Sequence, residues 1–199
     1  MEKNFMETLK NRRSVYGISS EAPVSDEKTA EIIKEAVKHV PSAFNNQSTK
    51  TAVLFGESHK TLWNIVMKTL KNIVPEDKFE PTEKKINSFA AGHGTILYFD
   101  DTEITKGLME KFPLYKDNFP IWAEQSNGMV QFAVWCLLEE LGFGATLQHY
   151  NPLIDEEVKK TFNLPAHWKL IAQMPFGKPT APAGEKDFAD IDERVKVFF

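Results

Sequence analysis

The feature that most constrains the fold is a predicted helix without a polar face. Residues 121–141 read IWAEQSNGMVQFAVWCLLEEL, and from Met129 to Leu138 they are apolar nearly all round. Such a helix must be buried on every side, either in a large core or against a partner subunit. A chain of 199 residues has limited room for this. The sequence therefore favours a dimer.

The single cysteine, Cys136, falls within this apolar run. We expect it to be a small buried hydrophobe rather than a nucleophile. One cysteine also excludes a disulfide within the chain and any multi-cysteine zinc or iron–sulfur site.

Composition narrows the class of protein further. The formal net charge is −4, whereas domains that bind nucleic acid carry a concentrated basic face. No stretch approaches the roughly 18 apolar residues of a membrane span, and the opening MEKNFMETLK lacks the apolar region of a secretory signal. With 42% apolar residues the chain can bury a sizeable core. We expect one domain over residues 1–199, cytoplasmic, that binds neither nucleic acid nor membrane.

Hydrophobic periodicity predicts several helices. Ser25 is a suitable N-cap, because acidic residues follow it and apolar residues then recur at helical spacing up to Pro41. A second amphipathic helix is predicted over residues 57–74. Asn151-Pro152 is expected to open another helix, since acidic residues at 155–157 favour an N-terminal turn.

Runs rich in β-formers alternate with these helices. Strands are predicted over residues 51–55, 94–99 and 168–177, and a turn followed by a strand over 142–150. The tail DERVKVFF alternates valines with charged residues, which suits an edge strand or a strand lent to another chain. This order of elements indicates an α/β or α+β fold.

Motifs of protein-based catalysis are absent from the sequence. There is no GxSxG, GxxxxGK[ST] or HExxH, and GHGTIL at 92–97 is no dinucleotide fingerprint, because Leu97 replaces its third glycine. The five histidines are widely spaced, which argues against a metal site, and His93 and His149 are more typical of structural or surface residues. If the chain is an enzyme, we expect a bound cofactor to carry the chemistry.

The segment NRRSVYGI at 11–18 allows two interpretations. Arg12 and Arg13 are cations at the end of a predicted helix, where they complement the helix dipole. Arginine also offers a planar fork of donors suited to phosphate, and Ser14 adds a hydroxyl. The segment alone leaves both a solvated helix end and an anion site open.

Four separated segments together resemble the FMN-dependent nitroreductase family. They are NRRSVYGI, PSAFNNQS at 41–48, GFGATLQHYNP at 142–152 and FGKP at 176–179. GTILYFDD at 94–101, the block that starts FPIWAEQ and the ending GEKDFADIDERVKVF are similar to a short branch of the family, the fatty-acid-repression-type nitroreductase-like oxidoreductases. The order and spacing of the segments carry the resemblance, which covers nearly the whole chain.

The resemblance implies an α+β fold, a nitroreductase-like α/β sandwich whose central, mostly antiparallel sheet is flanked by helices. It implies a homodimer with two FMN molecules at the subunit interface. It also implies a C-terminal strand exchanged with the partner subunit, which agrees with the alternating tail.

The activity implied by the resemblance is that of an FMN-dependent oxidoreductase. NADH or NADPH would pass a hydride to flavin N5, and a nitroaromatic or quinone-type acceptor would then take it in a second, ping-pong step without a catalytic side chain. The alternative is a flavin-binding regulatory or stress-response module with incidental turnover. The sequence identifies neither the physiological acceptor nor the choice between NADH and NADPH.

Site roles carry over at positions that match the family's motifs. Arg12 would contact the FMN phosphate, and Ser14 would face the ribityl-phosphate or pyrimidine end of the cofactor. Arg13 would also face the flavin, unless it is a surface charge. Lys178 and Lys186 are expected at the phosphate.

The segment PSAFNNQ would come from the other subunit. Its first three residues would line the edge of the flavin ring, and one of its three amides would hydrogen-bond the ring, Gln47 being favoured. Groups of TLQHY would pass close to the reactive ring nitrogen. The residues concerned are Pro41, Ser42, Ala43, Asn45, Asn46, Gln47, Leu147, Gln148 and His149.

One position departs from the pattern of the larger nitroreductases. Two residues after the motif serine they place a lysine near the flavin pyrimidine, and here that residue is Tyr16. Lys84 or Lys85 is an alternative source of the cation. Without one, the flavin potential would be lower and the substrate range different.

Longer relatives also carry a helical excursion that shapes the substrate pocket. This chain is short, so we expect an open pocket. Four aromatic residues either line it or belong to the core: Phe112, Tyr115, Phe119 and Trp122.

Overall fold

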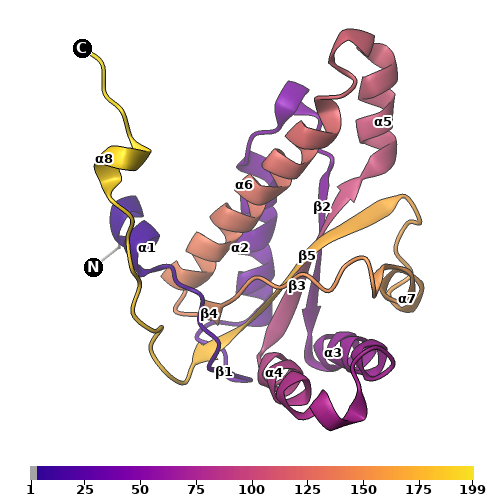
Figure 1. Cartoon of the computed structure of the whole chain (residues 1–199), viewed down its shortest axis with the longest axis vertical. Coiled ribbons are helices and arrows are strands. Elements are labelled where there is room, and N and C mark those ends of the chain that lie inside the picture. The colour runs from indigo at the N-terminus through magenta and orange to yellow at the C-terminus, as the bar shows by residue number, and fades with distance from the viewer. Residues whose placement is uncertain (1–3) are drawn as a thin grey trace.

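A single sheet separates two layers of helices in the computed structural model, which describes residues 4–199 (Figure 1). α2 (Asp26–His39) and α6 (Phe119–Glu140) pack on one face. α3 (Gly56–Lys71), α4 (Glu80–Ala90) and α7 (Asp155–Thr161) cover the other face. The expected α+β sandwich is confirmed.

The remaining helical elements lie around the long helix α6. α1 (Phe5–Asn11) packs beside its C-terminal end, and α5 (Thr102–Lys111) leads back to its N-terminal end (Figure 1). α8 (Ile191–Arg194) lies near α1 in the C-terminal segment. Three short 3₁₀ turns complete the set: η1 (Ala43–Asn45), η2 (Glu76–Lys78) and η3 (Pro113–Tyr115).

The sheet is antiparallel throughout the described residues, in the order β1-β5-β3-β2. β4 also pairs with β5, on the edge of β5 where β1 pairs. The strands are β1 (Ile18–Ser19), β2 (Thr49–Phe55), β3 (Gly94–Asp101), β4 (Gly144–Ala145) and β5 (Trp168–Pro179). The predicted antiparallel sheet is therefore confirmed, and β2 forms one of its edges.

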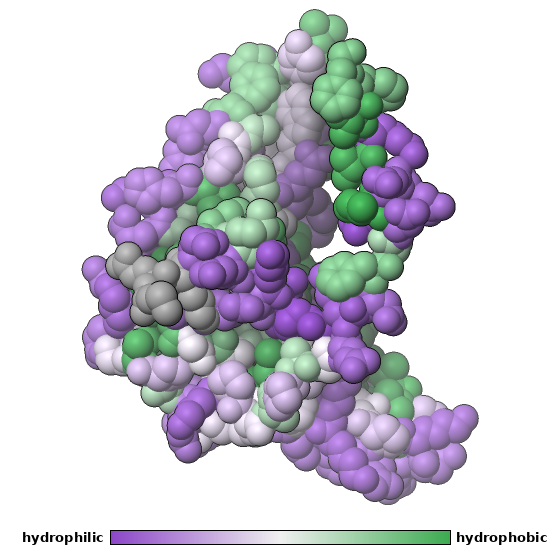
Figure 2. Space-filling view, turned by 90° about the vertical axis from the view of Figure 1, so that its left-hand side faces the viewer, coloured by the Kyte–Doolittle hydropathy of each residue, from purple (hydrophilic) through white to green (hydrophobic). Residues whose placement is uncertain are grey.

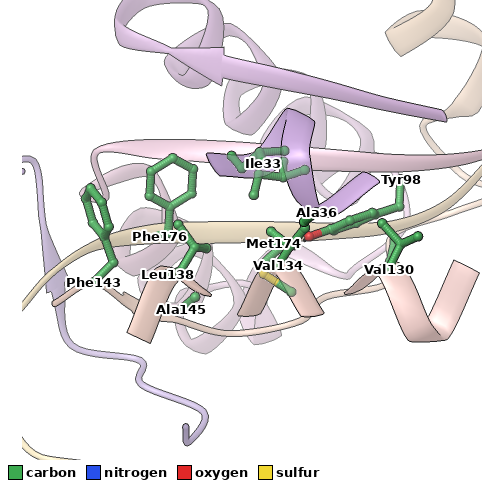
Figure 3. Close-up of a cluster of buried hydrophobic side chains, with 12 residues drawn as sticks. Ile33, Ala36, Tyr98, Val130, Val134, Leu138, Phe143, Ala145, Met174 and Phe176 are labelled. Atoms are coloured by element: carbon green, nitrogen blue, oxygen red, sulfur yellow. Dashed lines mark hydrogen bonds between the residues drawn. The ribbon is translucent and has the colours of Figure 1, made fainter. Parts of the chain in front are cut away.

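Alternation along β3 explains why both faces of the sheet are covered. Ile96 and Tyr98 point into the α2/α6 layer, whereas Leu97 and Phe99 point into the α3/α4 layer. Figure 3 shows the first of these cores, where Met174 and its neighbours from β5 meet side chains of α2 and α6. Each large apolar side chain buried in this way contributes about 1.5–3 kcal/mol to stability.

Most predicted elements agree with the structure. The Ser25 side chain caps α2 by accepting a hydrogen bond from the Lys28 N–H at 3.3 Å. β2, β3 and β5 contain the three predicted strands and extend them by two residues or more. Cys136 is buried, as expected for a hydrophobe in the apolar run.

Two local predictions are wrong, and a third is wrong in one of its two alternatives. The strand expected over 142–150 is reduced to β4 and a single bridge at Gln148, because Pro175 of β5 lies between these two pairings and has no N–H to donate to the ladder. α7 begins at Asp155 rather than at Asn151-Pro152, which lies in a turn. Within its own chain the tail forms α8 followed by irregular backbone rather than an edge strand, because no edge of its own sheet lies next to it (Figure 1), and the alternative of a strand lent to another chain stays a prediction.

The apolar helix α6 is not buried on every side by its own chain. Ile121, Met129 and Phe132 are 55, 42 and 38% exposed, and together with Gln125 they recur on one side of the helix. The single chain therefore leaves an apolar stripe at Ile121, Gln125, Met129 and Phe132. α6 and every other helix within residues 4–199 lack the length or apolarity needed to cross a membrane.

Candidate cofactor site

Four cations surround a cavity of about 330 Å³ at the C-terminal end of α1. No carboxylate lines this cavity, so its cations create a positive potential that favours an anionic ligand. Both ends of the chain contribute to it. The lining residues are Leu9, Lys10, Arg12, Arg13, Lys186 and Phe188.

Arg12 occupies a defined position between α1 and α6. Its backbone N–H donates to the Thr8 carbonyl at 2.8 Å, and the Thr8 hydroxyl donates to Glu140 at 2.8 Å, which fastens α1 to the end of α6. The guanidinium lies 4.5 Å from the centroid of the Trp135 ring, a cation–π contact that fixes its orientation.

The Arg12 guanidinium still lacks an acceptor. Its Nε is buried and has no hydrogen-bond partner in the part of the chain that the structure describes. A buried donor without an acceptor costs about 1–3 kcal/mol. This orphaned donor in a cationic cavity fits the phosphate of a cofactor.

Arg13 and Ser14 connect this cavity to two distant segments. Arg13 Nη2 donates to the Gly184 carbonyl at 2.6 Å, which holds the C-terminal segment and Lys186 beside α1. Ser14 forms a parallel bridge with Ala145, next to a 2.9 Å hydrogen bond from the Val15 N–H to the Ala145 carbonyl. The arginines therefore lie next to the segment that holds TLQHY.

Residues 147–149 run along the edge of β5. Gln148 exchanges backbone hydrogen bonds of 2.7 and 2.9 Å with Gln173, and its buried amide donates to Thr146 Oγ1 at 3.1 Å. Leu147 packs against the α2/α6 core, and His149 is exposed. The structure thus places Leu147, Gln148 and His149 shortly after Ala145, the residue that bridges to Ser14.

The two predicted phosphate lysines have different surroundings. Lys186 lines the cationic cavity. Lys178 instead forms an exposed ion pair with Glu21, at 2.6 Å between Nζ and Oε2, and this contact lowers the pKa of the Glu21 carboxyl. Lys178 does not line the cavity.

The segment PSAFNNQ lies towards the other end of α6. Pro41, Ser42 and Gln47 line a cavity of about 400 Å³, and Ala43 lines a neighbouring one of about 300 Å³. Ser126 of α6 borders both cavities, whereas Trp135 lies under Arg12. At 1.5 Å per residue these two positions are about 14 Å apart along the helix. One chain leaves the two halves of the predicted flavin site apart.

The three amides of this segment differ in their contacts. Gln47 is exposed, and its amide donates to the Asn45 carbonyl at 3.4 Å. Asn46 Oδ1 accepts from the Ser48 N–H at 3.0 Å, but its Nδ2 is buried without a partner among residues 4–199. Asn45 is exposed.

Strained backbone concentrates in the same segment. Phe44, Asn45 and Gln47 have φ angles of 57°, 49° and 53°. Non-glycine residues with positive φ are uncommon, and such strain gathers at functional sites.

An aromatic cluster surrounds Phe44. Its ring centroid lies 5.0 to 6.4 Å from the four rings that were predicted to line a pocket or join the core: Phe112, Tyr115, Phe119 and Trp122. Phe119 is fully buried, whereas Phe44 is 54% exposed. Phe44 and Trp122 both line the 300 Å³ cavity. Both interpretations hold in part: the cluster is a small core with an exposed aromatic face.

Lys84 and Lys85, the two alternative sources of the cation missing at Tyr16, differ in their contacts. Tyr16 lies 6.4 Å from Phe89 between ring centroids, and Lys85 Nζ lies 5.9 Å from the same ring. Lys84 pairs with Glu80 at 2.6 Å. Lys85 therefore shares Phe89 as a neighbour with Tyr16, whereas Lys84 is paired with Glu80.

His93 has a structural role. His93 contacts the Asp26 carboxylate at 2.6 Å and the Ser20 carbonyl at 2.9 Å. Among residues 4–199 no group of three or more histidine, cysteine or acidic side chains could hold a metal ion.

Sequence reasoning missed three residues of the site. Lys10 was not considered, although it stands two positions before Arg12 and is a visible cation. Nothing in the sequence indicates that Trp135 lies under Arg12, because that contact joins α1 to α6. The central position of Phe44 among four rings likewise depends on the tertiary structure.

Comparisons with known proteins agree on one family. Residues 9–178 match the model described as "Nitroreductase family". The nitroreductase FRM2 of Saccharomyces cerevisiae is 31% identical over 98% of this chain and 97% of its own length.

Solved structures give the same result. The nitroreductase CinD from Lactococcus lactis, in complex with 4-nitrophenol, is 46% identical, with a TM-score of 0.90 over 98% of this chain and all of that chain. A Desulfovibrio desulfuricans protein in complex with FMN is 19% identical, with a TM-score of 0.70 over all of this chain and 99% of that one, which shows a common fold.

Proposed function

The chain belongs to the nitroreductase family and is an oxidoreductase of that kind, and from this premise we propose that it uses FMN and NADH or NADPH to reduce nitroaromatic or quinone-type acceptors. The observation that carries the proposal is the buried, unpartnered Nε of Arg12 in a cavity lined by four cations. The FMN-bound structure with the same fold and the 4-nitrophenol complex of CinD support it.

When bound, FMN supplies the redox chemistry, taking a hydride at N5 from the nicotinamide and passing it to the acceptor in a second half-reaction. The protein's task is to bind and orient. Arg12 and Lys186 hold the phosphate, and the Trp135 ring keeps the Arg12 guanidinium in place. Charge-assisted hydrogen bonds of this kind are about twice as strong as neutral ones.

In this proposal, backbone groups of residues 145–149 would border the isoalloxazine. Lys85 lies over the Phe89 ring, the aromatic neighbour of Tyr16, and would supply the cation at the pyrimidine end. A cation there would stabilise the negative charge of the reduced cofactor. Lys85 would in this way replace the lysine that larger relatives carry where this chain has Tyr16.

A homodimer would complete the site. The apolar stripe of α6 lacks a partner, and Pro41, Ser42 and Ala43 lie towards the opposite end of this helix from Arg12. A two-fold pairing of α6 helices buries the stripe and brings these residues, with Asn46 or Gln47, to the partner's flavin. Exchange of the C-terminal tail between subunits is part of the same proposal.

The aromatic cluster is suited to the acceptor. Phe44 and Trp122 are stacked at 6.1 Å and line the 300 Å³ cavity. Flat aromatic rings stack on such surfaces. An acceptor between these rings and the partner's flavin lies within reach of the hydride.

Flavin binding and reduction test the proposal. The purified protein is titrated with FMN, and reduction of the bound flavin by NADH and NADPH is followed without oxygen, then reoxidation by 4-nitrophenol. We expect flavin absorbance, fast reduction and acceptor-dependent reoxidation. Absence of FMN binding would contradict the proposal, and binding with very slow reduction would favour the regulatory alternative.

A pair of variants tests the phosphate site. Arg12→Ala should weaken FMN binding roughly 10- to 100-fold, because it removes a charge-assisted contact worth about 1.5–3 kcal/mol. Lys178→Ala is the matched control, since its ammonium pairs with Glu21 outside the cavity. Unchanged FMN affinity in Arg12→Ala would remove the phosphate assignment.

A further inference from the structure

Residues 146–151 run along the edge of β5 on their way from β4 to α7 (Figure 1). The backbone ladder that holds them is sparse. The Thr146 N–H donates to the Pro175 carbonyl at 3.2 Å, and Gln148 exchanges two bonds with Gln173, but Pro175 has no N–H to donate in return. Within residues 4–199 no backbone bond joins residues 149–151 to β5. The end of the segment therefore depends on side chains.

Gln173 occupies an unusual place for an amide. Its neighbours Ala172 and Met174 face the α2/α6 core, so its own side chain points to the other face of the sheet. Hydrophilic residues spread over the face of the molecule that Figure 2 shows, whereas Gln173 is 0% exposed. A buried amide is unfavourable unless its oxygen and its nitrogen both find partners. The hydrogen bonds of this side chain thus decide whether a glutamine is stable here.

Both ends of the Gln173 amide bind the segment that leads from β4 to α7. Oε1 accepts from the Tyr150 N–H at 2.7 Å, and Nε2 donates to Asn151 Oδ1 at 3.3 Å. A backbone N–H only donates, which identifies the amide atom beside Tyr150 as the oxygen. The amide of Gln173 thus replaces the ladder bonds that the backbone of β5 does not supply to residues 150 and 151.

These contacts fix the backbone on both sides of His149. Gln148 is paired with the backbone of Gln173 at 2.7 and 2.9 Å, and Tyr150 is held by the Gln173 side chain. The Tyr150 ring also packs edge-on against Trp63, with 6.0 Å between the ring centroids. His149 itself is exposed. One buried residue of the sheet therefore sets the course of a segment whose exposed residue lies between two fixed neighbours.

We propose that Gln173 is a positioning residue of the flavin site. Through Gln148 and Tyr150 it holds the backbone groups of residues 148–150 where they border the isoalloxazine. Its side chain touches neither the cofactor nor the acceptor, and acts only through this segment. The inference rests on the proposed function and extends it to a buried residue of the sheet.

Gln173→Met tests the proposal, because methionine has nearly the length of glutamine but no amide. In the full-length, FMN-loaded protein we expect a shift in the midpoint potential and in the visible absorption bands of the bound flavin. The turnover number kcat should fall about tenfold, since small displacements near the reacting atoms are costly. The acceptor KM and the FMN dissociation constant should change little, because the aromatic cluster and the cationic cavity keep their residues.

Gln131→Met is the matched control. Gln131 is also a buried glutamine, and its amide donates to Asn127 Oδ1 at 2.7 Å within α6. In the described part of the chain this amide makes no hydrogen bond to residues 146–151. The variant should keep the flavin potential, the absorption bands and the kcat of the wild type.

Hydrogen exchange gives a measurement that does not need the cofactor. Without FMN, the Tyr150 N–H of Gln173→Met should exchange with solvent deuterium roughly tenfold faster than in the wild type, because its acceptor is gone. NMR spectroscopy follows this single amide. Asn151→Ala removes only the Nε2 contact and keeps Gln173 in the sheet. It should change the flavin potential and the exchange rate in the same direction, but less.

The outcomes separate this inference from the proposed function. A folded Gln173→Met variant with the flavin potential, absorption bands and kcat of the wild type overturns the inference and leaves the proposed function intact. Equal changes in Gln173→Met and Gln131→Met indicate a general loss of core packing and overturn it as well. If Gln173→Met does not fold, an unchanged potential and kcat in Asn151→Ala have the same meaning. A wild type that binds no FMN overturns both the proposed function and the inference.

Discussion

At the scale of single residues, Arg12 shows how a surface-like cation becomes part of a site. Its backbone ends α1, its guanidinium lies on Trp135, and its buried Nε lacks an acceptor. The sequence left a helix-end cation and an anion site open. The burial of one nitrogen favours the second interpretation, and burial follows from packing between helices that no local pattern encodes.

His59 carries a prediction about pH and stability. It is buried between Thr95, 2.8 Å from Nδ1, and the Ala90 carbonyl, 3.2 Å from Nε2. Burial lowers its pKa below the ordinary value of 6.5. The unfolded chain therefore takes up the proton first, so the free energy of unfolding falls as pH drops below about 6.5, by up to about 1.4 kcal/mol per unit.

Urea unfolding at pH 7.5, 6.5 and 5.5 measures this effect. His59→Gln removes the titrating group, so the wild type should lose more stability than the variant between pH 6.5 and 5.5. Every other ionisable group is common to both proteins, so the difference between their pH slopes isolates the contribution of His59. Equal pH slopes for the two proteins would show that His59 does not contribute.

The site was predictable from the sequence only where the resemblance named residues that the fold brings together. Arg12, Arg13 and Lys186 lie together as the resemblance implied. Lys178 does not, because the direction of β5 carries it to Glu21. Its position in FGKP could not reveal this, since Glu21 comes from the opposite end of the chain.

At the scale of elements, α6 links the fold to assembly. Val130 and Val134 face the sheet, whereas Met129 and Phe132 face outward. Its composition predicted burial on all sides, and one chain covers only part of it. The sequence of a helix that is apolar all round does not indicate which neighbour covers which side.

Phe132→Glu tests the exposed stripe of α6. A charge there would be desolvated at the proposed interface, which costs several kcal/mol. We expect a monomer with much weaker FMN binding but normal helix content, measured by light scattering, flavin titration and circular dichroism. Lys106→Glu, an exposed change on α5, is the control and should remain dimeric. A dimeric Phe132→Glu variant would mean that this stripe is not the interface.

Strands and helices with strong periodicity were predicted well, and weakly patterned ones were not. β3 shows the two-residue alternation between both cores, and α2 has a cap, an apolar stripe and a stop. The tail has strand-like alternation without a strand, because a strand also needs a free edge beside it. β2 has such an edge, but in the single chain it lies elsewhere.

At the scale of the whole molecule, ligand binding should add to stability. FMN binds the folded protein in the proposal, so a free concentration of about 100 times Kd raises the free energy of unfolding by about 2.7 kcal/mol. Riboflavin, which lacks the phosphate, should stabilise less at the same concentration. Thermal unfolding of the wild type and Arg12→Ala measures both ligands.

The comparison between the ligands is the informative result. Arg12→Ala should reduce the advantage of FMN over riboflavin, because it removes a contact to the phosphate alone. Equal stabilisation of the wild type by both ligands would show that the cationic cavity does not bind the phosphate.

The bond from Arg13 to Gly184 joins residues 171 positions apart. Lys186, which also lines the cationic cavity, follows two residues after Gly184. During synthesis, α1 and the two arginines that follow it leave the ribosome long before Lys186. The cavity therefore cannot be completed until that residue has been made. Long-range contacts of this kind form late in folding. If this cavity holds the FMN phosphate as proposed, cofactor loading follows the synthesis of Lys186, and a chain truncated before that residue has no complete phosphate site to load.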